Sequence, residues 1–127
     1  MAKMTLRLIV ALTGDGSYLF SIPSSVHWMA RRYRTPFLQV IYNNQGWRAP
    51  KFSALGVHPE GFASRAEDIG VGFASPPDHA GIAAAAGGAD AQTIQRPDEV
   101  RPALERALRA VREEGRAAVI DAWLAPL

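Results

Sequence analysis

Two apolar runs, each ending in a short polar turn, constrain the fold of this chain more than any other feature of its sequence. Residues 8–12 lead into the turn Gly14-Asp15-Gly16-Ser17, and residues 37–42 lead into Asn43-Asn44-Gln45-Gly46. Each run has the length and composition of a buried strand. If the two strands are parallel neighbours, both turns lie at the same carboxyl edge of a sheet, where open α/β sheets bind their ligands.

The rest of the chain alternates between helical and strand patterns. Helices are predicted over residues 22–33, 77–86 and from 97 to about 114, and further strands over residues 91–94 and 117–123. Pro102 is expected to force a kink or a short 3₁₀ turn at the start of the last helix. This order favours an α/β fold, a three-layer open parallel sheet with helices on both faces.

Composition limits the classes of protein to which the chain can belong. Its 127 residues suit one domain, 1–127, and it contains no cysteine, which excludes disulfides and thiolate chemistry. The net charge of +2 is too small to indicate a nucleic-acid partner. No apolar run approaches the ~18 residues that span a bilayer, and the first seven residues do not form a signal peptide. We therefore expect a cytoplasmic protein with no membrane partner.

The side chains of the two turns suggest a metal site. The carboxylate of Asp15 and the amide and carbonyl oxygens of the Asn43–Gly46 turn suit a hard cation such as Mg²⁺, which usually keeps a phosphate group as a co-ligand. Simpler interpretations remain open, since Asp15 could be an ordinary turn or helix-cap residue and the two asparagines could form an ordinary loop.

A Gly-Asp-Gly turn followed downstream by a pair of asparagines, each after a strand, resembles the cofactor signature of thiamine-diphosphate enzymes. Within that family the chain is most similar to the acetolactate synthase and 2-oxo acid decarboxylase group. The resemblance extends from about residue 8 to the last strand and matches only the carboxyl-terminal part of a much longer subunit. Because the family's cofactor domain has more strands than are visible here, the resemblance implies a partial, amino-terminally truncated domain with uncovered apolar surface.

The resemblance implies three ligands for Mg²⁺ in this chain. Asp15 is the expected carboxylate ligand, Asn44 the expected side-chain oxygen ligand, and Gly46 the expected main-chain carbonyl ligand. Oxygens of the diphosphate and a water molecule would complete the octahedron. Asn43 is interpreted as a structural turn residue, and no residue of the chain is assigned a catalytic role.

Four further residues are expected to contact the cofactor. Gly14 and Gly16 would allow the backbone to approach the diphosphate closely. The amides of Gly16 and Ser17 would donate hydrogen bonds to it. Trp47 occupies a position where the family often has an aromatic residue beside the cofactor. Residues 48–76 show no convincing periodicity, and the resemblance implies that they form a lid loop over the active site.

The resemblance also limits what the chain would do alone. In the family, the glutamate that activates the cofactor belongs to a separate pyrimidine-binding domain, usually across a dimer interface, and no part of this chain resembles that domain. We therefore expect a homo-oligomer or pairing with such a domain. By itself the chain would hold thiamine diphosphate and Mg²⁺ without turning over a 2-oxo acid substrate.

Two other classes of function remain open. The chain could be a non-catalytic interaction module or remnant that pairs with a longer subunit. It could also be a doubly wound nucleotide- or phosphate-binding domain, although it lacks the G-x-G-x-x-G and P-loop fingerprints.

Overall fold

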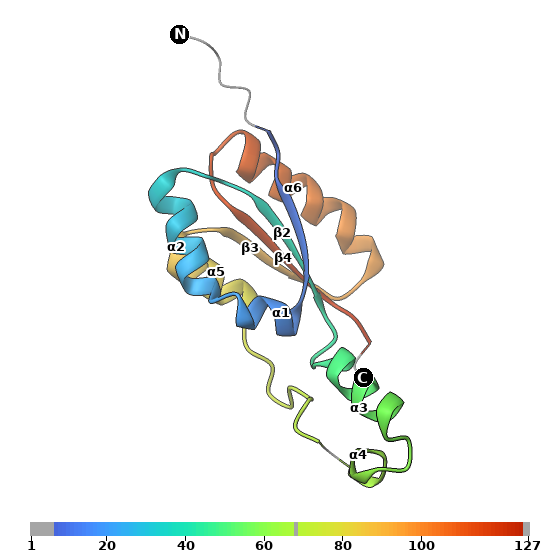
Figure 1. The fold of residues 1–127 in the computed structure, drawn as a ribbon. Helices are drawn as coiled ribbons and strands as arrows, with labels where there is room; N and C mark the ends of the chain where they lie inside the picture. Colours follow the sequence, from blue (N-terminus) through green and yellow to red (C-terminus); the bar gives the residue numbers. More distant parts are fainter. Residues whose placement is uncertain (1–6, 68, 126–127) are drawn as a thin grey trace.

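Four parallel strands form one open sheet in the computed structural model, which describes residues 7–67 and 69–125 (Figure 1). The strands are β1 (Val10–Gly14), β2 (Leu38–Asn43), β3 (Asp90–Ile94) and β4 (Ala118–Trp123), and they lie in the order β1-β2-β4-β3. Each adjacent pair is parallel, and the register places Gly14 beside Tyr42 and Asn43 beside Trp123. The carboxyl ends of β1, β2 and β4 therefore meet at one edge, as the sequence predicts.

Helices cover both faces of the sheet and complete the expected three layers (Figure 1). One face carries α6 (Val100–Arg112), which follows the 3₁₀ helix η1 (Pro97–Glu99). The opposite face carries α1 (Asp15–Phe20), α2 (Pro23–Tyr33) and α5 (His79–Gly87). The α/β prediction and the three predicted helices are therefore confirmed, including the 3₁₀ start of the last one.

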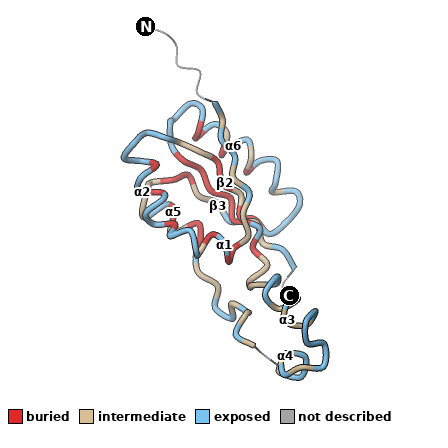
Figure 2. The backbone as a smooth tube through the Cα atoms, viewed as in Figure 1, coloured by how far each residue is buried: buried red, intermediate tan, exposed pale blue. Residues whose placement is uncertain are grey.

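Small side chains allow α6 to lie close to the sheet. Its buried residues are three alanines and one valine, which pack on alternate residues of β2 and β4 such as Leu38 and Ile120. The other face has its own core, in which Tyr18 and Ala83 pack against Ile41 and Val119. Figure 2 shows the buried residues concentrated in the strands and on the sheet-facing sides of the helices.

The α6 face of the sheet is only partly covered in the described structure. An apolar groove of about 390 Å³ runs beside α6, and Val10 and Leu12 of β1 and Val40 of β2 are among the residues that line it. The side chains of Val10 and Leu12 are 48% and 61% exposed. This exposed surface agrees with the expectation that part of the sheet lacks a covering element.

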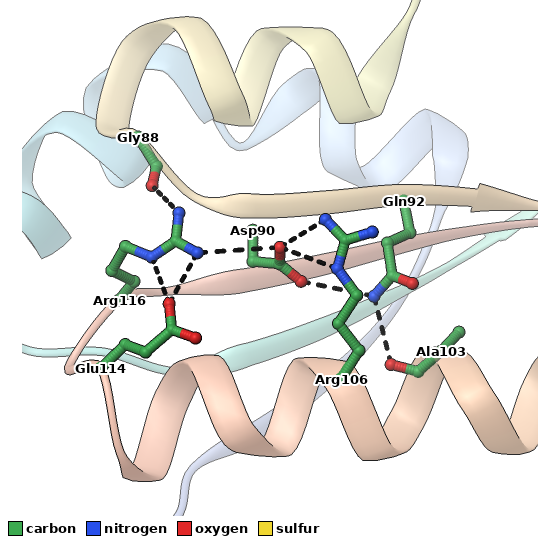
Figure 3. A network of polar contacts seen from close by, with 7 residues as sticks. All are labelled: Gly88, Asp90, Gln92, Ala103, Arg106, Glu114 and Arg116. Carbon is green, nitrogen blue, oxygen red and sulfur yellow. Dashed lines mark hydrogen bonds and ion pairs between the residues drawn. The ribbon is translucent and has the colours of Figure 1, made fainter.

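An ion-pair network holds α6 at the amino end of the sheet (Figure 3). Asp90, at the start of β3, is 6% exposed, and its Oδ1 accepts hydrogen bonds from Nε and Nη2 of Arg106 at 3.0 and 2.6 Å. Arg116 approaches the same oxygen at 3.8 Å and pairs with Glu114 at 2.7 Å. The buried carboxylate of Asp90 is thus matched by guanidinium groups, which offsets part of its desolvation cost.

The structure corrects the prediction for the first helix of the chain. The single helix predicted from about residue 22 is preceded by a further helix, α1, and Ile22 separates the two with a left-handed φ of 53°. Pro23 explains the break, because a proline disfavours helical geometry in the residue before it and has no amide hydrogen to donate to the preceding turn.

The segment 48–76 also differs from the irregular loop that was expected. It contains α3 (Arg48–Val57) and α4 (Phe62–Arg65), which extend away from the sheet beyond the carboxyl ends of the strands (Figure 1). Neither helix has a buried residue. The apolar periodicity that signals a helix arises from burial of one face, so these helices have no such signal in the sequence.

Candidate functional site

The Gly14–Ser17 turn carries a buried carboxylate at the end of β1. Asp15 is the first residue of α1 and is only 2% exposed. Its Oδ1 accepts a hydrogen bond from the Gly16 amide at 2.9 Å, and its Oδ2 accepts one from the Gly46 amide at 3.1 Å. The same carboxylate therefore joins the first turn to the second, and each oxygen keeps a further lone pair for a ligand.

The Asn43–Gly46 turn begins at the last residue of β2 and is stabilised by a hydrogen bond within the turn. The Asn43 side chain is fully buried, and its Oδ1 accepts a hydrogen bond from the Gln45 amide at 3.1 Å. Gln45 adopts a left-handed φ of 61°. Among the described residues, the buried Oδ1 of Asn44 has no hydrogen-bond partner. A buried amide oxygen of this kind is an acceptor available to a cation or a donor.

Aromatic side chains form one wall of the site. Trp47 stacks on Phe20 with ring centroids 5.5 Å apart and meets Phe73 edge-on at 4.7 Å. A Cβ atom at Gly16 would overlap the Trp47 indole, whereas one at Gly14 would meet nothing within 4 Å. Gly16 is therefore required by the packing of Trp47, and the open space beside Gly14 leaves room for a ligand.

A hollow of about 430 Å³ opens between the two turns. Every residue proposed from the sequence as a cofactor or metal contact lines this hollow: Gly14, Asp15, Gly16, Ser17, Asn44, Gly46 and Trp47. The first turn of α3, with Arg48 and Pro50, forms a further part of the wall. The structure thus gathers the seven residues at one place, at the carboxyl edge where ligands of open α/β sheets bind.

Segment 48–76 returns to the site at its far end. Gly72 forms an antiparallel bridge with Gly46. The Trp47 amide donates to the Val71 carbonyl at 2.8 Å, and the Phe73 amide donates to the Gln45 carbonyl at 2.8 Å. Both ends of the segment are therefore attached to the Asn43–Gly46 turn.

Asp121 is a buried acid that contacts the Asn43–Gly46 turn and was not predicted from the sequence. Asp121 lies on β4 and is 2% exposed, and its Oδ2 accepts hydrogen bonds from Asn43 Nδ2 at 3.3 Å and Trp123 Nε1 at 3.2 Å. Burial raises the pKa of this carboxyl, against the lowering effect of those hydrogen bonds. A single acid in the otherwise apolar run Ala118-Val119-Ile120 was the signal in the sequence that could have revealed it.

A buried pair of aromatic rings lies beside Asp121. The Tyr18 hydroxyl is within hydrogen-bonding distance of His27 Nε2, at 3.1 Å, and of the His79 carbonyl, at 3.2 Å. Burial raises the pKa of Tyr18, with a further contribution from Asp121, and burial lowers the pKa of His27. Both groups are therefore neutral at physiological pH, which makes this cluster a structural support rather than a charged part of the site.

The oxygen donors fit a hard divalent cation that shares its coordination with a ligand. Asp15 offers a carboxylate, Asn44 an amide oxygen without a partner among the described residues, and Gly46 a main-chain carbonyl. No cluster of three or more His, Cys, Asp or Glu side chains suited to a metal occurs in residues 7–67 and 69–125. A cation here would accordingly need oxygens from a bound phosphate group, as Mg²⁺ sites commonly use.

The sequence matches one known protein family over most of its length. It matches the thiamine pyrophosphate enzyme family, C-terminal TPP binding domain, over residues 1–122. The chain belongs to this family. Thiamine pyrophosphate is another name for thiamine diphosphate, so the resemblance expected from the two turns is confirmed. No curated protein sequence gives a significant match.

Solved structures of thiamine-diphosphate enzymes share the fold of this TPP-binding domain. A thiamine diphosphate-dependent 4-hydroxybenzoylformate decarboxylase from Rhodococcus jostii RHA1 superposes with a TM-score of 0.66 at 18% identity, over 95% of this chain and 20% of that one. A structure described as a thiamin diphosphate-dependent enzyme from Mycobacterium smegmatis gives 0.61 at 22% identity, over 93% and 18%. The chain therefore spans about a fifth of the length of each. In its described part, no helix is long and apolar enough to cross a bilayer.

Proposed function

We propose that this chain binds the diphosphate of thiamine diphosphate through Mg²⁺, as the cofactor-binding part of a 2-oxo acid decarboxylase or acetolactate synthase-like enzyme. The observation that carries the proposal is the hollow between the two turns, which brings Asp15, Asn44 and Gly46 together in a TPP-binding domain. The metal would join the Asp15 carboxylate to the diphosphate, two anionic groups that would otherwise repel each other.

Each remaining site residue has a role that its position supports. The open space beside Gly14 gives the diphosphate access to the backbone. The amides of Gly16 and Ser17 at the first turn of α1 would donate to the diphosphate, with the Gly16 amide giving up its hydrogen bond to Asp15 Oδ1. Trp47 forms an apolar wall beside the cofactor. Segment 48–76 would act as a lid over the site, and the bridge between Gly72 and Gly46 supports this role because it attaches the segment beside the hollow.

The bound cofactor would supply the carbanion chemistry that removes carbon dioxide from a 2-oxo acid or joins two carbon skeletons, and this chain would supply its binding and orientation. The chain would act within a homo-oligomer or with a pyrimidine-binding domain that carries the activating glutamate. The polypeptide of residues 1–127 alone should show no decarboxylation or carbon–carbon ligation above that of free cofactor.

Calorimetric titration of thiamine diphosphate into the purified chain, with and without Mg²⁺, tests the proposal. We expect binding that requires Mg²⁺ and is lost in Asp15→Ala. Asp98→Ala is a suitable control, because Asp98 is an exposed acid at the start of η1, away from the hollow. A folded chain that binds no thiamine diphosphate, or an Asp15→Ala variant that binds like the wild type, would refute the proposal.

The uncovered apolar groove favours a second candidate function. A non-catalytic interaction module that pairs with a longer thiamine-diphosphate subunit would bury Val10 and Leu12 of β1 in the contact. Co-purification with such a subunit, together with a failure to bind thiamine diphosphate in the titration, would support this alternative over the cofactor domain.

A further inference from the structure

We propose that Asp121 and Asn43 are positioning residues that fix the Asn43–Gly46 turn in the geometry needed to present the Asn44 amide oxygen and the Gly46 carbonyl to the cofactor metal. This proposal rests on the proposed function. It assigns a role to a buried acid on the last described strand, far from both turns in the sequence.

The Asn43 side chain links β4 to the turn. Its Nδ2 donates to Asp121 Oδ2 at 3.3 Å, and its Oδ1 accepts from the Gln45 amide at 3.1 Å. The Asn43 carbonyl also accepts from the Leu124 amide at 2.8 Å. With its donor and its acceptor both engaged, the amide of Asn43 has one orientation, set by Asp121.

The conformation that this linkage holds is a strained one. Gln45 has a φ of 61°, in the left-handed region that is unfavourable for a residue with a side chain. The hydrogen bond from the Gln45 amide to Asn43 stabilises this conformation directly. Asn44 lies between Asn43 and Gln45, so the two held residues fix the direction in which the Asn44 side chain leaves the backbone.

The buried carboxylate of Asp121 lowers the stability of the fold unless its interactions offset the cost of its desolvation. It is 2% exposed, and its Oδ1 has no hydrogen-bond partner among the described residues. An apolar residue at this point of a buried strand would avoid the desolvation cost. Within residues 7–67 and 69–125, no guanidinium pairs with this carboxylate as Arg106 pairs with Asp90, and its two hydrogen-bond donors are the Asn43 amide and the Trp123 indole. Orientation of Asn43 is therefore the role that its contacts support.

The donor and the acceptor of this contact can be exchanged. Asn43→Asp places a carboxylate against that of Asp121 and removes the donated hydrogen bond. Asp121→Asn keeps acceptor contacts to Asn43 and Trp123 through Oδ1, and serves as the conservative variant. The Trp123 indole donates to the same Oδ2 that accepts from Asn43, so the exchange is made in a Trp123→Phe background, where no second donor faces position 121. There the double variant, which combines Asn43→Asp with Asp121→Asn, restores a donor–acceptor pair with reversed direction, and the new carboxylate at position 43 still accepts from the Gln45 amide.

Two readouts separate positioning from general stability. The first is the Kd for thiamine diphosphate with saturating Mg²⁺, measured well below the unfolding temperature of each variant. The second is hydrogen exchange of the Gln45 amide in the ligand-free protein. Asp90→Asn is the matched control, because Asp90 is a similarly buried acid at the opposite end of the strands (Figure 3).

We expect Asn43→Asp to raise the Kd about 10- to 100-fold and to expose the Gln45 amide to exchange, as loss of a group that orients a ligand commonly does. In the Trp123→Phe background, the double variant should return both readouts to near the values of Trp123→Phe alone. Asp90→Asn should lower the unfolding temperature and leave the Kd unchanged.

Three results would overturn the proposal. They are an unchanged Kd in Asn43→Asp, a folded double variant that fails to recover binding, and a weakened Kd in Asp90→Asn equal to that in Asn43→Asp. The wild-type titration identifies a failure of the proposed function separately: a wild-type chain with a protected Gln45 amide and no affinity for the cofactor would refute that function and this role with it.

Discussion

At the residue scale, Asp15 shows how much of this site a local motif can predict. Its neighbours Gly14, Gly16 and Ser17 are adjacent in sequence and remain adjacent in the hollow. Asn44 could be added because both turns follow parallel strands. Asp121 could not be predicted in the same way, since its contact with Asn43 depends on the register of β2 with β4 and no local pattern encodes that register.

Acidification should destabilise the protein through His27. Burial lowers the folded-state pKa of His27 below its ordinary value of 6.5, so below that pH the unfolded chain binds more protons than the folded one. The stabilising contribution of the neutral ring is therefore complete above pH 6.5 and is lost as the pH falls toward the folded-state pKa. His27→Phe keeps a ring beside Phe37 and removes this titration.

Urea unfolding at about pH 7.5 and about pH 5.5 measures this effect. The free energy of unfolding should fall between the two pH values by more in the wild type than in His27→Phe. An equal loss in both proteins would show that His27 does not contribute, because the other histidines are common to both.

A hydroxyl deletion at Tyr18 tests the buried cluster next to it. Tyr18→Phe removes the group that reaches both His27 Nε2 and the His79 carbonyl while keeping the ring. Because the buried His79 carbonyl would lose its donor and His27 Nε2 would lose its hydrogen-bond partner, we expect a loss of about 1–3 kcal/mol in the free energy of unfolding, measured by urea denaturation. Tyr33→Phe, on an exposed side chain, should change it by less than about 0.5 kcal/mol.

At the scale of elements, prediction succeeded wherever burial leaves an apolar pattern in the sequence. The pattern of α6 repeats at helical spacing because one of its faces is packed, and β2 and β4 appear as continuous apolar runs because both of their faces are packed. The apolar spacing of α2 was less informative about its buried face: His27 is 1% exposed, whereas Met29 and Tyr33 are 48% and 63% exposed. The polar side chain of His27 is buried on this helix because the Tyr18 hydroxyl provides a hydrogen-bond partner, and the spacing of apolar residues in the sequence cannot show such a partner.

Close packing of α2 against α5 depends on Gly87. A Cβ atom at this position would lie 2.6 Å from the main-chain carbonyl carbon of His27 and would overlap its oxygen. Gly87→Ala should therefore push the two helices apart and cost about 1–3 kcal/mol in the free energy of unfolding, measured by urea denaturation. Gly56→Ala, in α3, meets nothing within 4 Å and should be neutral or stabilising by up to about 1 kcal/mol. Similar losses in both variants would contradict this account of the helix contact.

At the scale of the whole molecule, the exposed part of the sheet determines how the chain behaves in solution. Val10 and Leu12 are exposed on β1, and the adjoining groove is apolar. An uncovered strand with apolar side chains is a surface on which copies of a protein associate. The sequence predicted this surface through the family resemblance, because composition alone gives no information on which strand lies at an edge.

Replacement of Leu12 by lysine should reduce self-association. Sedimentation velocity over a range of protein concentrations should show less association for Leu12→Lys than for the wild type, with a free energy of unfolding within about 0.5 kcal/mol because the side chain is already exposed. Val57→Lys changes an exposed apolar residue of α3, outside the groove, and should associate like the wild type. If both substitutions act equally, general surface hydrophobicity and not β1 drives association.

The strand order also determines when this molecule can fold during its synthesis. Of the four described strands, β4 leaves the ribosome last, yet it lies between β2 and β3. Until it emerges, the β1–β2 half and the β3 half of the sheet have no shared neighbour, and Asn43 has no Asp121 to meet. The nascent chain therefore carries a divided sheet until residues 118–123 have emerged, a period in which nascent-chain chaperones would have most to protect.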